Sequence, residues 1–518
     1  MQDNLSANNK RIAKNTLLLY FRMLLTMLVT LYTSRVVLRE LGVDDYGIYN
    51  VVGGVVAMFN VISGALSSAI SRFITFELGT GNQEKLKRVF SSAITIQVII
   101  GLIVILFAET IGLWFVNNKM VIPADRMDAA QWVYHFSVIT FAVNLISVPY
   151  NAVIIAHEKM SAFAYISIIE VACKLGIALC LVYSPIDRLI FYGFLLMVVA
   201  VMVRMIYAYY CKRHFDECSR YTFLWDKSLL KEMFGFAGWN FIGTSSVVLR
   251  DQGGNILINM FYGPEVNAAR GLSMQVSLAI QAFVTNFMTA LRPQITKSYA
   301  SGQHEYMMTL IFQGARLSYY ILLLLSLPVI FNASFLLSVW LETVPAYTAT
   351  FVQLVLIFAL SESLASPLIS VMLATGKIRN YQLLVGGLQL LNLPLSYIFM
   401  KLGFAPEVVF VVAIFVSVIS EMARLYMLRK MIGLPVRSFL VKVYFNVLVV
   451  TVAASIFPYL FAAGTEVSIS NFLISCLICL ICTSLSIYFI GCNKEDRQMI
   501  RSFLGKVVSK IRNKSRNA

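Results

Sequence analysis

Long apolar stretches separated by short polar segments recur from Asn15 almost to the C-terminus. Crossing about 30 Å of hydrocarbon takes roughly 20 helical residues, and most stretches are at least that long. Apolar and polar positions do not alternate in segments such as 94–107, which argues against membrane β-strands. The pattern therefore predicts an all-α membrane protein of about 14 transmembrane helices, at 15–38, 46–70, 89–116, 129–156, 161–184, 188–211, 232–261, 266–291, 307–331, 347–374, 380–400, 407–428, 438–461 and 469–491. The weakest of the predicted breaks are the short polar connections at 184–188 and 376–380.

Basic residues test this set of spans, because Lys and Arg collect in the cytoplasmic loops of membrane proteins. With the N-terminus inside, alternate loops hold about 30 of the 42 basic residues, the outside loops hold about 5, and the others lie within spans. The loops around Glu265, Glu342 and Glu466 contain none. A missed helix would destroy this segregation. We therefore expect a multi-pass protein of a bacterial inner (plasma) membrane, with both termini cytoplasmic.

Composition agrees, since 59% of the residues are hydrophobic, 13% are charged and the mean hydropathy is +0.76. A soluble chain of 518 residues would need far more polar surface. The net charge of +16 is chiefly a signal of topology. It favours anionic membrane lipids as partners of the basic face and no nucleic acid.

The last segment of the chain is strongly basic. Its eight Lys and Arg are interleaved with apolar residues at helical spacing, from Ile500 to Ile511. This pattern predicts an amphipathic helix on the cytoplasmic leaflet, or an ordinary positively charged topology anchor.

The chain also matches itself at two nearly equal offsets. The first offset aligns Gly42 with Gly263, Asp44 with Glu265, Gly81 with Gly302 and Glu84 with Glu305. The second, slightly shorter offset aligns Pro149 with Pro367, Ala156 with Ala374 and Lys159 with Lys377.

These matches predict an internal repeat of two parallel six-helix lobes around a central cavity. The N-terminal lobe would comprise residues 1–215 and the C-terminal lobe 225–431, followed by two additional transmembrane helices at 432–491 and a basic cytoplasmic tail at 492–518. Parallel halves related by an axis along the membrane normal are typical of transporters, whose cavity opens to either side by rocking.

Several short motifs carry a family resemblance. The stretch 33–49 contains Thr-Ser-Arg and Leu-Gly-Val-Asp-Asp-Tyr-Gly-Ile-Tyr, and Ser71-Arg72-Phe73 and Gly79-Thr80-Gly81-Asn82 follow it. These motifs resemble those of the polysaccharide-biosynthesis flippases, which serve O-antigen, lipopolysaccharide and capsule assembly within the superfamily of multidrug extruders and lipid II flippases. Fourteen spans resemble the polysaccharide and lipid II branches more than the usual twelve-span drug extruders.

The resemblance implies a function and its partners. The expected substrate is an undecaprenyl-pyrophosphate-linked oligosaccharide, moved from the cytoplasmic to the periplasmic leaflet by alternating access. Other polysaccharide-assembly proteins are expected as further partners.

The most unusual polar segment lies in the middle of span 232–261, where Arg250-Asp251-Gln252-Gly253-Gly254-Asn255 interrupts an apolar helix. A charge near the bilayer centre costs a few kcal/mol or more. Paired glycines also favour a local bend or unwinding, which is tolerated there only against protein or a wet cavity. We therefore expect Arg250 to bind the substrate's pyrophosphate and Asp251 to restrain it or take part in ion coupling; a buried structural ion pair is the alternative.

Other substrate-binding candidates are Arg270, Arg22 and Arg35. Arg270, early in its span, is the best partner for Arg250, since lipid-pyrophosphate flippases use several cavity cations. Arg22 and Arg35 lie about 140° apart around a straight helix, so both cannot face one cavity. Arg35 lies near the outer end of its span, where it could extend to the interface.

Candidate ion-coupling residues other than Asp251 are Glu170, Lys174 and Glu362. Glu170 and Lys174 are four residues apart in the favourable order, so a neutralised structural pair is the stronger interpretation. Glu362 lies mid-span among serines and is either a proton or sodium site or a protonated packing residue.

Signatures of enzymes are absent from the sequence. Its four histidines are isolated, and Cys476, Cys479 and Cys482 lie in an apolar helix without a fourth ligand, so no metal site is expected. No ATPase-type phosphate loop appears either. We therefore expect no cofactor, and coupling to an H⁺ or Na⁺ gradient, the membrane potential or consumption of the product.

Three classes of function remain. A lipid-linked oligosaccharide flippase comes first and an ion-coupled small-molecule or multidrug antiporter of the same superfamily second. A membrane glycan polymerase or ligase comes last, because the longest outside loop spans only Asn117 to Asp128. The charge of the cavity distinguishes the first two, since cations suit a pyrophosphate whereas carboxylates and aromatic rings suit cationic drugs.

Overall fold

The computed structural model describes residues 2–57, 60–119, 122–223, 226–341, 344–464, 468–493 and 497. Every element in these ranges is helical, and they contain no strand. Twelve of the described helical segments are long and apolar enough to cross a membrane. The two remaining predicted spans are helical as well where they are described: 46–70 covers the end of α1 (Gln2–Ala57) and the start of α2 (Asn60–Thr80), and 232–261 lies within α8 (Lys227–Ala300). The predicted fold class is therefore confirmed.

The helices are joined by short connections, two of which confirm the weakest predicted breaks, at 184–187 and 376–378. The other helices are α3 (Gln83–Phe107), α4 (Leu113–Lys119), α5 (Met127–Ala156), α6 (Met160–Cys180), α7 (Arg188–His214), α9 (His304–Phe331), α10 (Ala333–Trp340), α11 (Thr348–Thr375), α12 (Arg379–Tyr381), α13 (Gly387–Leu390), α14 (Asn392–Lys401), α15 (Val408–Ile432), α16 (Val436–Phe439), α17 (Asn446–Gly464) and α18 (Ile469–Ser486). Short π-helical turns lie at Ala108–Gly112, Gln382–Gly386, Leu440–Phe445 and Ile487–Gly491.

Side-chain caps fix where several helices begin. Asn82 accepts a hydrogen bond from the backbone of α3, Asp187 from α7, Asp226 from α8 and Ser468 from α18. Such caps satisfy backbone N–H groups that the first helical turn leaves unpaired. They therefore place the starts of these helices within the short polar connections.

The chain packs as two compact units. Unit 1 comprises Met1–Val247, Thr289–Met307 and Ser370–Gly386, and unit 2 comprises Val248–Met288, Met308–Ile369 and Gly387–Ala518. Unit 1 thus contains the ends of α8 and α11 together with the N-terminal helices. The predicted lobe boundaries at 215 and 225 stay a prediction, because these units are defined by packing rather than by the repeat.

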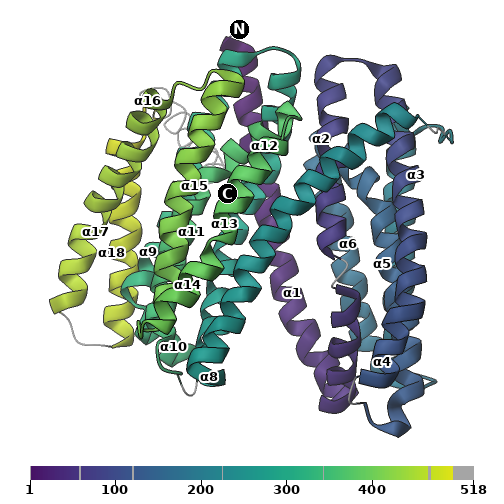
Figure 1. The fold of residues 1–518 in the computed structure, drawn as a ribbon. Helices are drawn as coiled ribbons and strands as arrows, with labels where there is room; N and C mark the ends of the chain where they lie inside the picture. The colour runs from purple at the N-terminus through teal and green to yellow at the C-terminus, as the bar shows by residue number, and fades with distance from the viewer. Residues whose placement is uncertain are drawn as a thin grey trace, which may run out of the picture. The chain divides into compact units, whose positions relative to one another are not determined.

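In unit 1, α3, α5, α6 and α7 run side by side (Figure 1). Phe90 and Tyr134 are fully buried there, and the Tyr134 hydroxyl donates a hydrogen bond of 2.8 Å to the Ala108 carbonyl. The α2 helix also lies very close to the end of α8: a Cβ on Gly79 would come within 2.7 Å of Ala300 Cβ. Only glycine permits this approach.

In unit 2, α17 and α18 form an antiparallel pair (Figure 1). A separate core surrounds Phe351 and Phe410, whose ring centroids are 5.0 Å apart. Residues from α8, α10, α11 and α15 build this core. Each unit therefore has its own buried apolar cluster.

Glycines that are aligned by the first offset of the sequence repeat also have the same backbone conformation. Both Gly42 and Gly263 have φ +81°, and each marks a kink inside a long helix, α1 and α8. The next pair, Gly81 and Gly302, has φ +74° and +73°. A positive φ is unfavourable for residues with a side chain, so glycine is needed at these four turns. The two predicted halves therefore turn in the same way at equivalent positions.

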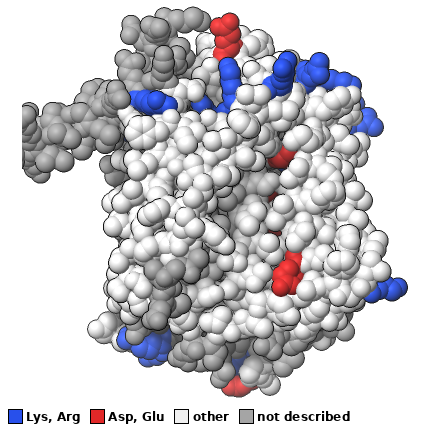
Figure 2. Space-filling view, turned by 90° about the vertical axis from the view of Figure 1, so that its left-hand side faces the viewer, with Lys and Arg blue, Asp and Glu red and all other residues white. Residues whose placement is uncertain are grey.

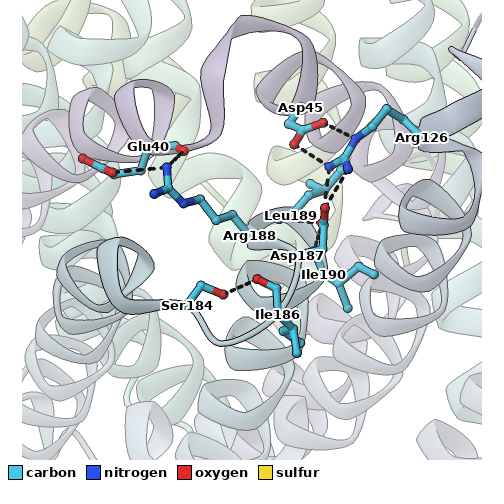
Figure 3. A network of polar contacts seen from close by, with 9 residues as sticks. All are labelled: Glu40, Asp45, Arg126, Ser184, Ile186, Asp187, Arg188, Leu189 and Ile190. Atoms are coloured by element: carbon cyan, nitrogen blue, oxygen red, sulfur yellow. Dashed lines mark hydrogen bonds and ion pairs between the residues drawn. The ribbon is translucent and has the colours of Figure 1, made fainter.

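A network of ion pairs joins three of the predicted outside segments of unit 1 (Figure 3). Arg126 donates to Asp45 Oδ1 from Nε at 2.8 Å and to Asp187 Oδ2 from Nη1 at 2.6 Å. Arg188 donates to the Glu40 carbonyl at 2.9 Å. Burial alone would raise the pKa of Asp187, but hydrogen bonds from Arg126 and the backbone outweigh it and lower that pKa. Arg188 Nη1 also lies 3.6 Å from Glu40 Oε2, so Arg126 and Arg188 are both paired with carboxylates.

Charged side chains are unevenly distributed on the face in Figure 2. Blue Lys and Arg side chains gather along its upper margin, and a broad, almost uncharged band lies below them. This distribution is what a membrane-crossing surface requires. Which margin is cytoplasmic stays a prediction.

Three features named in the sequence analysis involve residues that the structure does not describe. The basic tail lies outside the described residues except for 492, 493 and 497, and so do Glu342 and Glu466. Arg497 donates to the Phe489 carbonyl at 2.6 Å. This bond lies at the C-terminal end of the last described helical turn.

Candidate functional site

The polar segment 250–255 is helical throughout, so the predicted break at its paired glycines is wrong. The kink of α8 lies instead at Gly263. The two glycines make room for neighbours: a Cβ on Gly253 would lie 2.2 Å from a methyl carbon of Leu393, and one on Gly254 would lie 2.7 Å from Arg270 Nη1. The role of the two glycines is therefore to allow close packing of their neighbours. The sequence indicated only that glycines are flexible, and it did not indicate this packing.

Arg250, Asp251 and Arg270 line one cavity of about 110 Å³ in unit 2, which we name the Arg250 cavity. Arg250 donates from Nε to Asp251 Oδ1 at 2.9 Å and from Nη1 to Gln389 Oε1 at 3.0 Å. Its guanidinium lies over the Phe358 ring, 4.9 Å from the centroid. The structure thus brings the two arginines together as expected, and it also forms the ion pair of the alternative interpretation.

Arg270 is the less satisfied of the two cations. It is only 4% exposed, and its Nη2 donates to the Asp251 carbonyl at 3.2 Å. Its Nε and Nη1 are buried without a hydrogen-bond partner among the described residues. Leaving charged donors unpaired in a buried site is costly. An anion in the Arg250 cavity would satisfy them.

Glu362 lies in unit 2 and accepts a hydrogen bond of 2.5 Å from Ser417, on α15. On the same helix, the buried pair Glu421 and Arg424 forms an ion pair, and Tyr444 donates to Glu421 at 3.1 Å. Sequence reasoning missed this pair, although its spacing of three residues within a predicted span is a detectable signal. Glu362 itself forms no ion pair with a described residue.

The remaining predicted site residues lie in unit 1. Arg22 donates to the Ser167 hydroxyl at 3.4 Å and lies 4.7 Å from the Phe163 ring centroid. Glu170 and Lys174 form an ion pair of 2.6 Å, as the structural interpretation expects. The side chain of Arg35 lies outside the described residues. Arg22 and the Glu170–Lys174 pair therefore do not share the cavity of Arg250.

A second cationic cavity, of about 320 Å³, lies in unit 1; we name it the Arg292 cavity. Its lining includes Arg72 and Arg292, and none of its lining residues is acidic. Seven hydroxyl side chains complete its polar wall: Ser67, Ser68, Ser71, Thr75, Thr289, Thr296 and Ser370. Two guanidinium groups among hydroxyls form an environment suited to phosphate oxygens and sugar hydroxyls.

Arg292 is the most available cation of this cavity. The surrounding protein lies close to Arg292 on most sides, but its side chain remains accessible from the cavity that it lines. Its guanidinium makes no hydrogen bond or ion pair with any described residue. Sequence reasoning missed Arg292, because this residue directly follows the predicted span 266–291. Arg72 was noticed there as part of a family motif and not as a site residue.

Residues that correspond to one another in the sequence repeat line the Arg292 cavity together. At the first offset its lining pairs as Ser68 with Thr289, Ser71 with Arg292, Arg72 with Pro293 and Thr75 with Thr296; at the second offset Ile155 pairs with Leu373. Segments from both predicted halves therefore line this cavity in equivalent places. The repeat was the signal that could have located it.

The fold is similar to that of solved membrane transporters. It matches an outward-facing multidrug-resistance transporter of the MATE family in the MOP superfamily, with a TM-score of 0.70 and 12% identity over 82% of this chain and 96% of that one. It also matches a MOP-superfamily transporter from Pyrococcus furiosus, with a TM-score of 0.69, 12% identity and the same coverage.

The chain belongs to the polysaccharide biosynthesis protein family, whose model matches residues 12–299. A curated relative is the uncharacterized membrane protein EpsK of Bacillus subtilis (strain 168), which is 20% identical over 305 residues. The match covers 59% of this chain and 60% of the length of EpsK. The family, this fold and the twelve apolar helices among the described residues support a multi-pass membrane protein.

Proposed function

We propose that this protein is a flippase that moves an undecaprenyl-pyrophosphate-linked oligosaccharide from the cytoplasmic to the periplasmic leaflet of a bacterial inner membrane by alternating access. The observation that carries the proposal is the Arg292 cavity, with two arginines, seven hydroxyls and no acidic lining residue. A pyrophosphate carries about two negative charges that must leave water as the headgroup crosses, so donors must be in place beforehand. Membership of the polysaccharide biosynthesis family supports the glycan part of the substrate.

The Arg250 cavity supports the same assignment. It contains two arginines and one aspartate, and Arg270 has buried donors without partners among the described residues. An antiporter of cationic drugs, the second class, is favoured only by the likeness of fold. Neither cavity has the predominantly acidic lining that attracts organic cations.

The first prediction is made for purified protein in vesicles. Reconstituted protein should move a fluorescent polyprenyl-pyrophosphate oligosaccharide from one leaflet to the other, measured as loss of access to an impermeant glycosidase added outside. Vesicles without the protein are the control. Transport of a cationic dye with no movement of the glycolipid would contradict the proposal and support the drug-antiporter class.

A gene deletion gives the cellular counterpart of this assay. Lipid-linked repeat units should accumulate on the cytoplasmic leaflet of the deletion strain. Normal surface polysaccharide without such accumulation would contradict the flippase assignment.

Ion coupling is a further part of the proposal, and Glu362 is its site. Glu362 lies inside a predicted span, bonded to Ser417 but without an ion-pair partner among the described residues, whereas Glu421 is paired with Arg424. An unpaired carboxylate can exchange a proton or bind Na⁺ at little structural cost. Asp251 is the weaker candidate, since Arg250 already holds it.

The second prediction concerns this coupling. Imposing an H⁺ or Na⁺ gradient on the vesicles should accelerate glycolipid transport, and Glu362→Gln should remove the acceleration while slower, gradient-independent movement remains. Glu407→Gln, which removes a carboxylate at the start of α15, is the matched control and should keep the response. An unchanged response in Glu362→Gln would exclude Glu362 as the coupling residue.

A further inference from the structure

A third cavity in unit 1, of about 240 Å³, lies beside Gly376, and we name it the Gly376 cavity. Its charged lining consists of four cations and one carboxylate: Arg72, Lys231, Lys377, Arg379 and Glu232. Lys377 lies in the short turn between α11 and α12, and Arg379 begins α12. The cavity is therefore strongly cationic.

Most of this positive charge is not compensated within the described protein. Lys231, Lys377 and Arg379 are exposed and form no ion pair with a described residue. Arg72 approaches Glu232 only to 4.0 Å, and that carboxylate is 63% exposed. With four cations and one carboxylate among its lining residues, the cavity has excess positive charge.

Arg72 is fixed in place mainly by uncharged groups. Its guanidinium lies 4.6 Å from the Phe73 ring centroid and 5.5 Å from that of Phe236, and its Nη2 donates to the Ala374 carbonyl at 3.4 Å. Its Nε is buried without a hydrogen-bond partner among the described residues. Arg72 lines the Arg292 cavity as well, so the two cavities share this residue.

The sequence repeat gives the Gly376 cavity a counterpart elsewhere in unit 1, centred on Glu158. At the second offset, Gly376 corresponds to Glu158 and Lys377 to Lys159. At the first offset, Glu232 corresponds to Arg11, and Phe76 to Lys297. Gly376 and Glu158 even share a positive φ, of 74° and 58°.

In the counterpart, the carboxylate of Glu158 is 2% exposed and is held by basic and amide groups. It bonds to Arg11 Nε at 2.7 Å, Lys297 Nζ at 2.9 Å and Gln294 Nε2 at 2.6 Å. The anion at the centre of this place is thus supplied by the chain itself. At the corresponding position of the second predicted half, Gly376 has no side chain and supplies no carboxylate.

Glycine also leaves room there for the cation. A Cβ on Gly376 would lie 2.4 Å from Arg72 Nη2. The charges of the two related places therefore differ: the first has a carboxylate at its centre, whereas the second has Arg72, Lys377 and Arg379 around a glycine, and its one carboxylate, Glu232, stands at the position of Arg11. We propose that the Gly376 cavity binds a phosphate or pyrophosphate group, which takes the place that the Glu158 carboxylate occupies in the other half.

Two sources can supply such a group, the headgroup of an anionic lipid and a soluble phosphate compound. Lys231 and Lys377 belong to segments that the positive-inside pattern places on the cytoplasmic side, where anionic lipids concentrate. If the proposed flippase function holds, the pyrophosphate of the substrate is one such headgroup, and Arg72 would contact it before it enters the Arg292 cavity. Binding itself does not depend on transport.

The test uses the purified full-length protein in neutral detergent, titrated with sodium pyrophosphate by isothermal calorimetry. Wild-type protein should bind, with an affinity that falls as salt rises. Lys377→Gln combined with Arg379→Gln should weaken binding by at least about tenfold, because charge-assisted hydrogen bonds to phosphate are lost. Lys159→Gln, an exposed lysine at the repeat-related position, is the matched control and should bind as the wild type does.

A second variant, Gly376→Glu, tests the comparison with Glu158. The new carboxylate should pair with Arg72, whose flexible end must shift slightly, and should weaken pyrophosphate binding at least as much as the Lys377 and Arg379 changes do. Gly376→Gln introduces similar bulk and backbone strain without charge, and it should retain more binding than Gly376→Glu. Equal loss in both variants would show that bulk rather than charge is responsible and would overturn the proposal.

Nanodiscs identify the source of the group. If phosphatidylglycerol occupies the cavity, it should lower the affinity of the wild type for pyrophosphate relative to phosphatidylcholine alone, which assigns the site to a lipid headgroup. Equal affinity in both lipids assigns it to a soluble phosphate compound. Absence of pyrophosphate binding in detergent, or binding that the Lys377 and Arg379 changes leave intact, would refute the site even if glycolipid transport is observed.

Discussion

Replacing Arg292 with glutamine should strongly reduce transport of the lipid-linked oligosaccharide while the protein still folds and inserts. Arg292 is exposed to a cavity in which the only other cation among the lining residues is Arg72. Glutamine keeps a hydrogen-bonding side chain but removes one of two charges that a pyrophosphate requires. A hydrogen bond to a charged group contributes about 1.5–3 kcal/mol, so the transport rate should fall by roughly 10- to 100-fold or more. The measurement is glycolipid movement in vesicles at equal amounts of inserted protein.

Arg204 provides a matched control for this change. Like Arg292, it belongs to unit 1, but it packs over the Tyr150 ring at 4.0 Å and does not line the Arg292 cavity. Arg204→Gln should therefore leave the rate nearly unchanged. Wild-type transport by Arg292→Gln would remove the Arg292 cavity from the substrate path.

The repeat allows a stricter form of the same experiment. Ser71 corresponds to Arg292 at the first offset, and both residues line the same cavity. Exchanging them, as Ser71→Arg with Arg292→Ser, returns a guanidinium to the equivalent wall. We expect partial recovery of transport, because the new charge lies next to Arg72 and is repelled by it.

The sequence predicted the helices well because the bilayer imposes a simple rule on them. Apolar length and the segregation of basic residues do not depend on which helix packs against which. The breaks near Ser184 and Gly376 and the repeated turns at Gly42 and Gly263 follow from local residue chemistry, and the structure confirms them. Arg250 and Arg270 were paired in advance because the family resemblance implies several cations in one cavity, and the structure brings them together in α8.

Features that depend on packing between distant segments could not be read in the same way. The role of Gly253 and Gly254 is set by Leu393 and Arg270, so a local preference for bending gave the wrong result. Arg292 and Arg72 lie far apart in the sequence, and only the folded chain shows that they line one cavity. The repeat contained this information, but only two of the aligned polar pairs, Ser68 with Thr289 and Thr75 with Thr296, are alike, and small hydroxyl residues are common in any sequence.

The second large effect is expected at Arg250. This residue either binds the substrate or only neutralises Asp251, and its contacts suggest variants that distinguish these two roles. Arg250 donates to both Asp251 and Gln389, and its side chain is 11% exposed at the Arg250 cavity. Arg250→Ala should reduce transport by roughly 10- to 100-fold, because it removes hydrogen-bond donors as well as charge. Arg250→Lys should retain part of the rate, since it keeps the charge but loses the planar fork. The measurement is glycolipid transport, with the melting temperature as a check on folding.

The double change Arg250→Ala with Asp251→Ala separates the two roles. It restores the net charge of the Arg250 cavity and leaves no carboxylate without a partner, so a purely structural ion pair predicts full recovery of transport. A pyrophosphate, however, needs N–H donors at fixed positions, and alanine supplies none. We therefore expect the melting temperature to recover in the double variant while transport stays low. Recovery of both would make Arg250 a structural partner of Asp251 and leave Arg270, whose Nε and Nη1 are buried without partners among the described residues, as the cation that contacts substrate in this cavity.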